Sequence, residues 1–309
     1  MSVIIPAYKV ARFIEETLNS VLSQTFTEYE IIIINDGSPD TPELEAVLSK
    51  FQDKIKYLKQ ENKGAGAARN AGLQVAQGEF VGFLDGDDAW YPEFLADQLA
   101  LIRSNGGYDL VYSNALIVGD SPWAGKTYMD RDPSNGDATF DALIGERCLV
   151  ITSGVLARRE PIIEVGLFDE TLRNSQDFDL WVRLAKYANA KITYQRKVLL
   201  RHRANAGSLA SDSIKSVEGE LKVLDKVSKW TLSDTERKTL EGTLALRRAS
   251  VEYDRAKRSL LQGDYQAAAK SLRFANEYYR SPKLKVILLG LKIAPQMLRR
   301  YVDRKLNKH

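Results

Sequence analysis

The chain has 309 residues, of which 44% are hydrophobic and 28% are charged, as in folded proteins and unlike disordered ones. Its single cysteine, Cys148, excludes an intrachain disulfide, so nothing indicates an oxidising compartment. The formal net charge of +3 is uneven, because residues 281–309 carry eight Lys or Arg and one Asp, which leaves a net of −4 for the remainder. A basic segment on an acidic body argues against a nucleic-acid-binding protein and for a local anionic partner.

The N-terminal stretch, MSVIIPAY, has neither a basic n-region nor a long apolar region. We therefore expect it to form the first core strand and not a signal peptide. Near the other end, the apolar run VILLGL at 286–291 lies between two lysines and is far too short to span a bilayer. These features predict a cytoplasmic protein, with any membrane contact peripheral and at the inner face of the plasma membrane.

Short apolar runs alternate with segments of helical periodicity from residue 3 to about residue 118. Strands are predicted for the runs SVIIP, EIIIIND, IKYLKQ, EFVGFLD and YDLVYSNALIV. Helices are predicted between them, over 10–22, 42–52, 66–76 and 91–103. This alternation indicates right-handed βαβ units and a largely parallel sheet, which is an α/β fold.

Ligands of such sheets bind beyond the carboxyl ends of the strands. Three predicted strand ends carry polar or turn-forming residues, namely Pro6-Ala7-Tyr8, Asn35-Asp36-Gly37-Ser38 and Asp85-Gly86-Asp87-Asp88. These three ends are therefore the candidates for a shared binding site.

The second half of the chain changes character near residue 210. Residues 119–138 are rich in Gly, Pro, Ser and Asp and predict a long loop, of the kind that often forms lids or binding loops. A strand in 149–159, a helix over 178–188 and a strand over 191–203 follow, and from about 211 only helical periodicity remains. We expect two domains, an α/β domain at 1–210 and a helical region at 211–309.

Three carboxylates crowd the end of FVGFLDGDDAW, and two interpretations remain open. One is a solvated turn in which Asp88 caps the helix that starts at Tyr91. The other is a divalent-cation site, because Mg²⁺ and Mn²⁺ prefer carboxylate oxygens and bind through one or two of them plus substrate phosphates. Asp36 at another strand end, and Arg69 among small residues near a helix start where a diphosphate can approach, favour the second.

Five segments in order resemble the family 2 glycosyltransferases, which are inverting enzymes of the GT-A fold. They are VIIPAYKVARFIEETLNSVLSQTF, IIIINDGSPD, ENKGAGAARNAGL, EFVGFLDGDDAW and NSQDFDLWVRLA, and the resemblance covers roughly residues 2–210. It implies a Rossmann-like, mostly parallel central sheet flanked by helices, with the α-helical C-terminal region as an addition.

The resemblance also implies roles for residues at the strand ends. The residues that would hold the nucleoside of the donor are Pro6, Ala7, Tyr8 and Asp36. Arg69 would lie near the base or diphosphate, Asp85 would face the ribose or sugar, and Asp87 would be the main ligand of Mn²⁺ or Mg²⁺.

Asp177 falls on the position of the family's catalytic base, in Gln176-Asp177-Phe178-Asp179-Leu180-Trp181. Its alternative role is that of N-terminal cap for the following helix. Gln176 replaces a common Glu, which removes a negative charge beside the base. After the last strand of the family's domain a His often lies near the metal, and here the candidates for a metal ligand are His202 and Asn205.

The resemblance implies a nucleotide-sugar donor, with a UDP-sugar expected, a glycan or lipid-linked acceptor, and a place in cell-envelope or exopolysaccharide synthesis. A non-catalytic sugar-nucleotide-binding or scaffold protein of the same fold is the alternative. A nucleotidyltransferase would carry a Gly-rich, basic signature after the first strand, where this chain has PAYKVARF.

The C-terminal region contains two recognisable segments. The first, ALRRASVEYDRAKRSLLQGDYQAAAKSLRFANEYY, resembles a tetratricopeptide-like helical hairpin with Gly263-Asp264-Tyr265 in its turn. The second, within 281–309, is amphipathic and basic, which suits an anionic membrane surface. Packing of this segment on its own domain, with a solvated basic face, remains the alternative.

Overall fold

The computed structural model describes residues 1–104, 106–134, 136–204 and 213–306. The chain forms two compact units, Met1–Ser208 and Leu209–His309, which are described separately. The domain boundary predicted near residue 210 lies within 205–212, outside the described residues.

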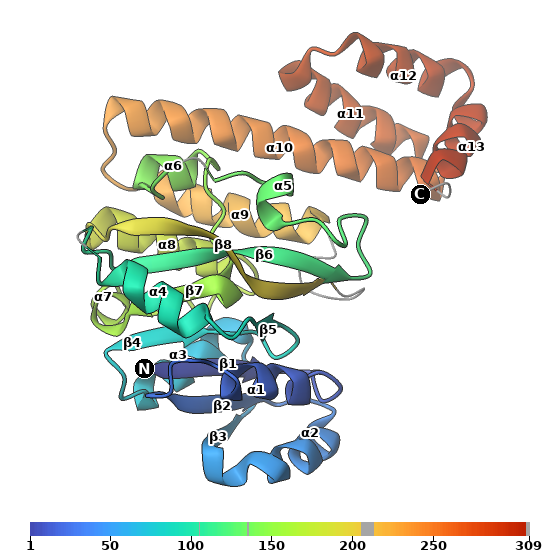
Figure 1. Ribbon diagram of the computed structural model, residues 1–309. Coiled ribbons are helices and arrows are strands. Elements are labelled where there is room, and N and C mark those ends of the chain that lie inside the picture. The colour runs from blue at the N-terminus through green and yellow to red at the C-terminus, as the bar shows by residue number, and fades with distance from the viewer. Residues whose placement is uncertain (105, 135, 205–212, 307–309) are drawn as a thin grey trace. The chain divides into compact units, whose positions relative to one another are not determined.

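The first unit is built on one eight-stranded sheet of order β3-β2-β1-β4-β7-β6-β8-β5 (Figure 1). Its first four strands are parallel to one another: β1 (Ser2–Ala7), β2 (Glu30–Asp36), β3 (Ile55–Gln60) and β4 (Phe80–Phe83). They are joined through α1 (Ile14–Leu22), α2 (Thr41–Leu48) with the 3₁₀ turn η1 (Ser49–Lys54), and α3 (Ala65–Val75). The predicted βαβ alternation is confirmed over this part of the chain.

The other half of the sheet is mixed in direction. It contains β7 (Val155–Arg158), β6 (Leu110–Gly119), β8 (Ile192–Ala204) and the two-residue β5 (Ala89–Trp90). Strand β7 is antiparallel to both β4 and β6, β8 is parallel to β6, and β5 is antiparallel to β8. The predicted α/β class is confirmed, with the parallel pairing concentrated in the first half of the sheet.

Helices and turns connect these strands. They are α4 (Phe94–Ile102), α5 (Tyr128–Arg131), α6 (Phe140–Ile144), the 3₁₀ turn η2 (Thr152–Gly154), α7 (Arg159–Glu164) and α8 (Gln176–Tyr187). The predicted loop 119–138 therefore contains a short helix, α5, whose start is closed by a capping box between Thr127 and Asp130.

Two layers of helices cover the parallel half of the sheet. The run Ile31–Ile34 is continuously buried, as expected for a strand covered on both faces. Val3 and Ile33 share a core cluster with apolar side chains of α1 and α2. Residues one position further along point to the other face, where a Cβ on Gly72 of α3 would lie 2.6 Å from the Ile4 side chain, so glycine permits this close packing.

The second unit is entirely helical over its described residues. Its helices are α9 (Ser213–Val227), α10 (Asp234–Gln262), α11 (Tyr265–Tyr279), α12 (Pro282–Ile293) and α13 (Pro295–Leu306). Gly263 ends α10 with φ +84°, and the Asp264 side chain accepts a hydrogen bond from the backbone N–H of Ala267 to begin α11. The turn predicted at Gly263-Asp264-Tyr265 is thus confirmed.

The helices of the second unit bury their own apolar cluster, formed by Ala256, Leu260, Ala268, Leu272, Leu284 and Leu291. Among the described residues, no helix in either unit combines the length and apolarity needed to cross a bilayer.

Candidate active site

Asp36, at the end of β2, connects this strand to the loop that opens α3. Its buried carboxylate accepts hydrogen bonds from the Gln60 side chain (2.8 Å) and from the backbone N–H groups of Lys63 (2.9 Å) and Gly64 (2.8 Å). A carboxylate has about four lone-pair directions, so acceptor capacity remains for one further donor. Asp36 therefore holds the loop in place and retains acceptor capacity for one more donor.

The turn 85–88 follows β4 and lies against the end of β1. A Cβ on Gly86 would lie 3.1 Å from the Pro6 carbonyl oxygen and 2.9 Å from the Val10 side chain. Only glycine lets the two strand ends approach this closely. Pro6, the first of the predicted nucleoside residues 6–8, therefore lies beside this acidic turn, while Ala7 is buried and the ring of Tyr8 is exposed.

Asp85 pairs with Arg69 of α3. The Arg69 guanidinium donates from Nη2 to the Asp85 carboxylate, and the Ser153 hydroxyl accepts from the Asp85 backbone N–H at 3.1 Å. Arg69 is 3% exposed and lies over the ring of Phe168, with 5.6 Å between the guanidinium carbon and the ring centroid. Its Nε and Nη1 have no hydrogen-bond partner, although both are buried.

Asp177 lies in the first turn of α8. The Thr152 hydroxyl donates to its Oδ2 at 2.7 Å, and the Phe178 backbone N–H donates to its Oδ1 at 2.9 Å. The N-cap of α8 is Ser175, so the alternative role of Asp177 as helix cap is wrong. Because Thr152 and Ser153 are consecutive, η2 holds both Asp177 and Asp85.

Helix α8 carries further buried polar atoms without a partner. Among the described residues they include the Gln176 carbonyl oxygen and the Trp181 indole N–H. A Cβ on Gly66 of α3 would lie 3.1 Å from the Gln176 side chain, so the starts of α3 and α8 meet. Buried polar groups nearly always have a partner, which makes this group of atoms typical of a place where water or ligand completes the bonding.

Asp88 has a different role from the one predicted. It is buried, and its carboxylate accepts from the Arg203 backbone N–H at 2.7 Å and contacts Nδ1 of His202 at 3.1 Å. The predicted helix cap is wrong, because α4 begins at Phe94 with Glu93 as its N-cap. Asp88 instead joins the acidic turn to the end of β8.

The His202 imidazole belongs to this pairing. Burial alone would lower the pKa of His202, but the Asp88 carboxylate, with smaller contributions from Asp85 and Asp87, raises the pKa above its usual value. Nδ1 of His202 is engaged by Asp88, so only Nε2 could reach a metal. The other candidate at this position, Asn205, lies outside the described residues.

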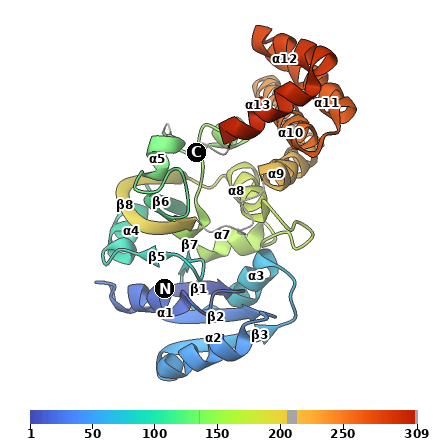
Figure 2. The ribbon, with the colours of Figure 1, turned by 90° about the vertical axis from the view of Figure 1, so that its right-hand side faces the viewer.

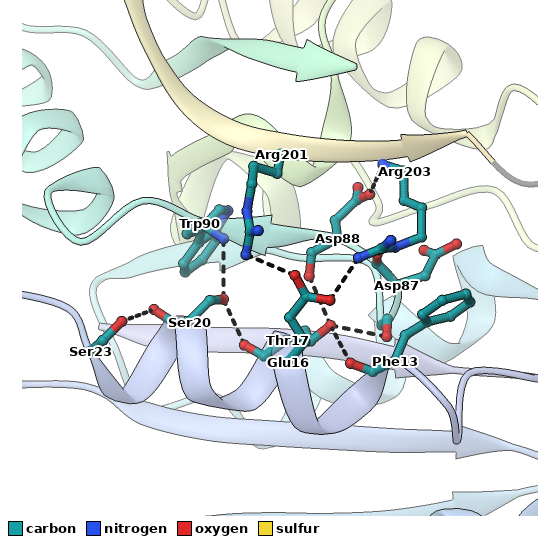
Figure 3. Close-up of polar contacts among 11 residues, drawn as sticks. Phe13, Glu16, Thr17, Ser20, Ser23, Asp87, Asp88, Trp90, Arg201 and Arg203 are labelled. Carbon is teal, nitrogen blue, oxygen red and sulfur yellow. Dashed lines mark hydrogen bonds and ion pairs between the residues drawn. The ribbon is translucent and has the colours of Figure 1, made fainter. Parts of the chain in front are cut away.

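Helix α1 holds the acidic turn from the opposite side (Figure 3). The buried Thr17 hydroxyl contacts the carbonyl oxygens of Gly86 at 3.0 Å and Asp88 at 2.8 Å. The Glu16 carboxylate pairs with Arg201 at 2.8 Å and with Arg203 at 2.7 Å. Nothing in the local sequence marks Glu16 or Thr17, since both lie within an ordinary amphipathic helix.

Asp87 is the remaining carboxylate of the turn. Its backbone carbonyl accepts from Nε of Arg203 at 3.0 Å, while its half-buried carboxylate extends away from the contacts drawn in Figure 3. No group of three or more His, Cys, Asp or Glu that could hold a metal occurs in the described part of the chain. The donor set at the turn, hard carboxylate oxygens, suits Mg²⁺ or Mn²⁺ bound together with substrate phosphates.

The model of the family described as glycosyl transferase family 2 matches residues 2–166, which is more than half of the chain. The chain belongs to this family. The GT-A fold expected from the sequence resemblance is likewise confirmed by the mixed sheet, its flanking helices and the solved structures that it resembles.

Curated relatives support the same family. An uncharacterized glycosyltransferase of Rickettsia conorii is 31% identical over 246 residues, which is 79% of this chain and 40% of the relative. The amylovoran biosynthesis glycosyltransferase AmsB of Erwinia amylovora is 34% identical over 193 residues, which is 60% of this chain and 64% of that protein. This family 2 chain thus spans about two fifths of the length of the Rickettsia relative.

Solved structures of low sequence identity share the fold. The S. aureus TarS fragment 1–349 in complex with UDP-GlcNAc has a TM-score of 0.63 at 20% identity, over 99% of this chain and 91% of that chain. The mannosyltransferase PcManGT from Pyrobaculum calidifontis, in complex with GDP-Man and Mn²⁺, has a TM-score of 0.62 at 16% identity, over 98% and 83%. At these identities the likeness concerns the fold alone.

Proposed function

We propose that this family 2 chain transfers a sugar from a nucleotide-diphosphate sugar to an acceptor hydroxyl, with inversion at the anomeric carbon. One observation carries the proposal: η2 joins Asp85 and Asp177 through consecutive residues, beside buried polar atoms that lack partners. This arrangement supports a donor-binding carboxylate and a base acting on the same substrate. The catalytic domain would comprise residues 1–210, and the helical region would comprise 211–309.

The donor would lie across the parallel strand ends. Asp36 would accept a hydrogen bond from the nucleoside, which the segment Pro6-Ala7-Tyr8 would flank, and Asp85 would face the ribose or sugar. The unpartnered nitrogens of Arg69 would donate to the base or diphosphate, since guanidinium groups bind phosphate well. A UDP-sugar is the expected donor, in keeping with the UDP-GlcNAc complex of the TarS fragment.

Asp87 would hold Mn²⁺ or Mg²⁺, which when bound neutralises the charge that grows on the diphosphate as the bond from C1 to oxygen breaks. Nε2 of His202, or Asn205, would be an additional ligand. The Mn²⁺ complex of PcManGT supports use of a divalent cation in this fold.

Asp177 would act as the general base. Its carboxylate would take the proton from an acceptor hydroxyl as that oxygen attacks C1 from the side opposite the diphosphate, so one displacement inverts the centre. The bonds donated by Thr152 and by the Phe178 backbone would fix the carboxylate's orientation during this transfer. Gln176 places no second negative charge beside it.

The acceptor would be a glycan or a lipid-linked saccharide in cell-envelope or exopolysaccharide synthesis. The name of the relative AmsB, an amylovoran biosynthesis glycosyltransferase, supports this class. The protein would then act in the cytoplasm, at the inner face of the plasma membrane where lipid-linked acceptors are found. No nucleic acid would be involved.

A donor screen tests the proposal directly. Thermal shift measured with UDP-, GDP-, dTDP- and CMP-sugars, with Mn²⁺ or with EDTA, should show stabilisation by one nucleotide class that requires the metal. Slow hydrolysis of the same donor, followed as nucleotide release, would separate an enzyme from a non-catalytic binding protein. Absence of any metal-dependent shift across the four donors would refute the proposal.

A further inference from the structure

The last two described helices are α12 and α13 (Figures 1 and 2), and they carry several exposed apolar side chains. The four most exposed large hydrophobic side chains of the described residues all lie here: Val286, Ile293, Met297 and Tyr301, between 62% and 72% exposed. Leu289, also exposed, lies between the first two along the chain. This set of five side chains is called the apolar stripe below.

Helix α12 is apolar on two opposite sides. One side, with Leu284 and Leu291 buried and Ile287 and Leu288 packed beside them, joins the unit's own core. The stripe residues of α12 fall at spacings of three and four, which places them together on the other side of the helix. A helix that is hydrophobic all round is normally covered all round. Within the described residues of the helical unit, the stripe has no covering partner.

Basic side chains accompany the stripe. Exposed Lys285 and Lys292 follow each other at a spacing of seven, along one margin of the stripe on α12, and Lys283 and Arg300 are exposed nearby. Residues 282–303 contain five Lys or Arg and a single acid, Asp303. An apolar surface with lysines at its margin is suited to a bilayer interface, because the side chains insert while the ammonium groups stay at the headgroups.

The positive charge of the lysines also distinguishes between two partners that could cover the stripe, a second copy of the chain and a membrane. A second copy of the chain, docked through the same face, would bring Lys285 and Lys292 close to their equivalents, and like charges in an interface are unfavourable. A surface of anionic phospholipid instead supplies the opposite charge and an apolar interior together. Helix α12 does pack on its own domain, as the alternative interpretation of this segment predicted, but only through the side that carries Leu284 and Leu291. The opposite side, which carries the stripe, stays exposed.

We propose that the apolar stripe and its lysines dock the helical unit on a membrane that contains anionic phospholipid. This inference concerns a surface outside the candidate active site and does not depend on the proposed sugar transfer. If transfer to a lipid-linked acceptor holds as well, docking would raise the local concentration of that acceptor.

Vesicle co-sedimentation of the full chain tests the docking. Binding is expected to vesicles of equal parts phosphatidylglycerol and phosphatidylcholine, to fall with added salt, and to be absent with phosphatidylcholine alone. The double variant Ile293→Gln/Met297→Gln should bind at least ~10-fold more weakly, because two inserted side chains are lost. Lys285→Gln/Lys292→Gln should weaken binding about fivefold per charge removed.

Two matched variants serve as controls. Ile163→Gln/Tyr187→Gln removes exposed apolar side chains from the first unit, and Lys54→Gln/Lys229→Gln removes two exposed lysines elsewhere. Both should bind as the unaltered chain does, and all four variants should keep its circular dichroism and melting temperature. No donor or turnover is needed, so failure here is distinguishable from failure of the proposed transfer.

Three results would overturn the docking proposal. They are absence of binding to the mixed vesicles at low salt, equal weakening by the control variants, and a lipid-free dimer in sedimentation velocity that Ile293→Gln/Met297→Gln dissociates. The last result would assign the stripe to an interface between copies of the chain.

Discussion

The turn 85–88 has two sides that differ in how completely their polar groups are paired. On the side of α1 and β8, Asp88 is paired with the end of β8 and Thr17 with two carbonyl groups of the turn. On the side of α3 and α8, two buried nitrogens of Arg69 have no hydrogen-bond partner. The same is true of one buried atom each in Gln176 and Trp181. The first will be called the paired side and the second the open side.

This difference indicates that one side of the turn has a structural role and the other side a role in binding or catalysis. Each unpartnered buried group costs about 1–3 kcal/mol, so a chain retains several together only where a ligand or water offsets the cost. The paired side fixes the position of the turn, and the open side is left to meet the substrate. Substitutions on the open side should therefore reduce activity more than stability, and substitutions on the paired side should do the reverse.

Asp177→Asn on the open side should have the largest effect. The amide keeps the shape of the side chain but cannot accept the acceptor's proton, so transfer should fall by at least ~100-fold. Donor binding and the midpoint of denaturant unfolding should stay close to those of the unaltered chain. Single-turnover transfer and calorimetric donor titration measure the two effects, and unchanged turnover would exclude Asp177 as the base.

Asp87→Ala tests the metal ligand within the same turn. Because its carboxylate would hold the cation that neutralises charge on the diphosphate, donor affinity should lose its dependence on Mn²⁺. Isothermal titration with Mn²⁺ and with EDTA measures this, with the exposed Asp53→Ala as a control of equal charge change. Equal donor affinity of the unaltered chain in both buffers would remove the metal from the proposal.

The open side could be read from the sequence to a large extent. Asp36, Asp85 and Asp87 follow apolar runs that had to be parallel inner strands, and the ends of such strands meet at one edge of the sheet. Arg69 was predicted at this site because a helix start among small residues suits phosphate, and the structure places it against Asp85. These inferences need only local patterns and one rule of topology.

The paired side could not be read in this way. The local preference of aspartate for helix caps predicted a role for Asp88 that is wrong, since its partner His202 lies 114 positions away. The Glu16 and Arg203 pair spans 187 positions and depends on where β8 ends in the sheet. Such contacts follow from the tertiary fold, which periodicity and capping preferences do not encode.

Thr17→Val tests the paired side. The variant keeps the size of the buried side chain but leaves the carbonyl groups of Gly86 and Asp88 without its hydroxyl, so the free energy of unfolding should fall by about 1–3 kcal/mol. Urea denaturation measures the loss, and the exposed Thr25→Val, which gives up a single 3.3 Å bond, should change little. A Thr17→Val chain of full stability but impaired transfer would contradict the division into two sides.

The smallest effect should be a dependence of stability on pH through His202 and Asp88. The pKa of His202 is higher in the folded state than its ordinary value of 6.5, so protonation of the imidazole stabilises the fold. This stabilisation is fully present at pH values below 6.5 and is lost as the pH rises through the pKa of the folded state. In EDTA, the unfolding free energy of the unaltered chain minus that of His202→Gln should therefore shrink as the pH rises above 6.5. A difference that stays constant or grows over this range would mean that the contact with Asp88 does not favour the charged imidazole. The paired side would then be held by Thr17 and by the backbone bond from Arg203 to Asp88, without a contribution from histidine charge.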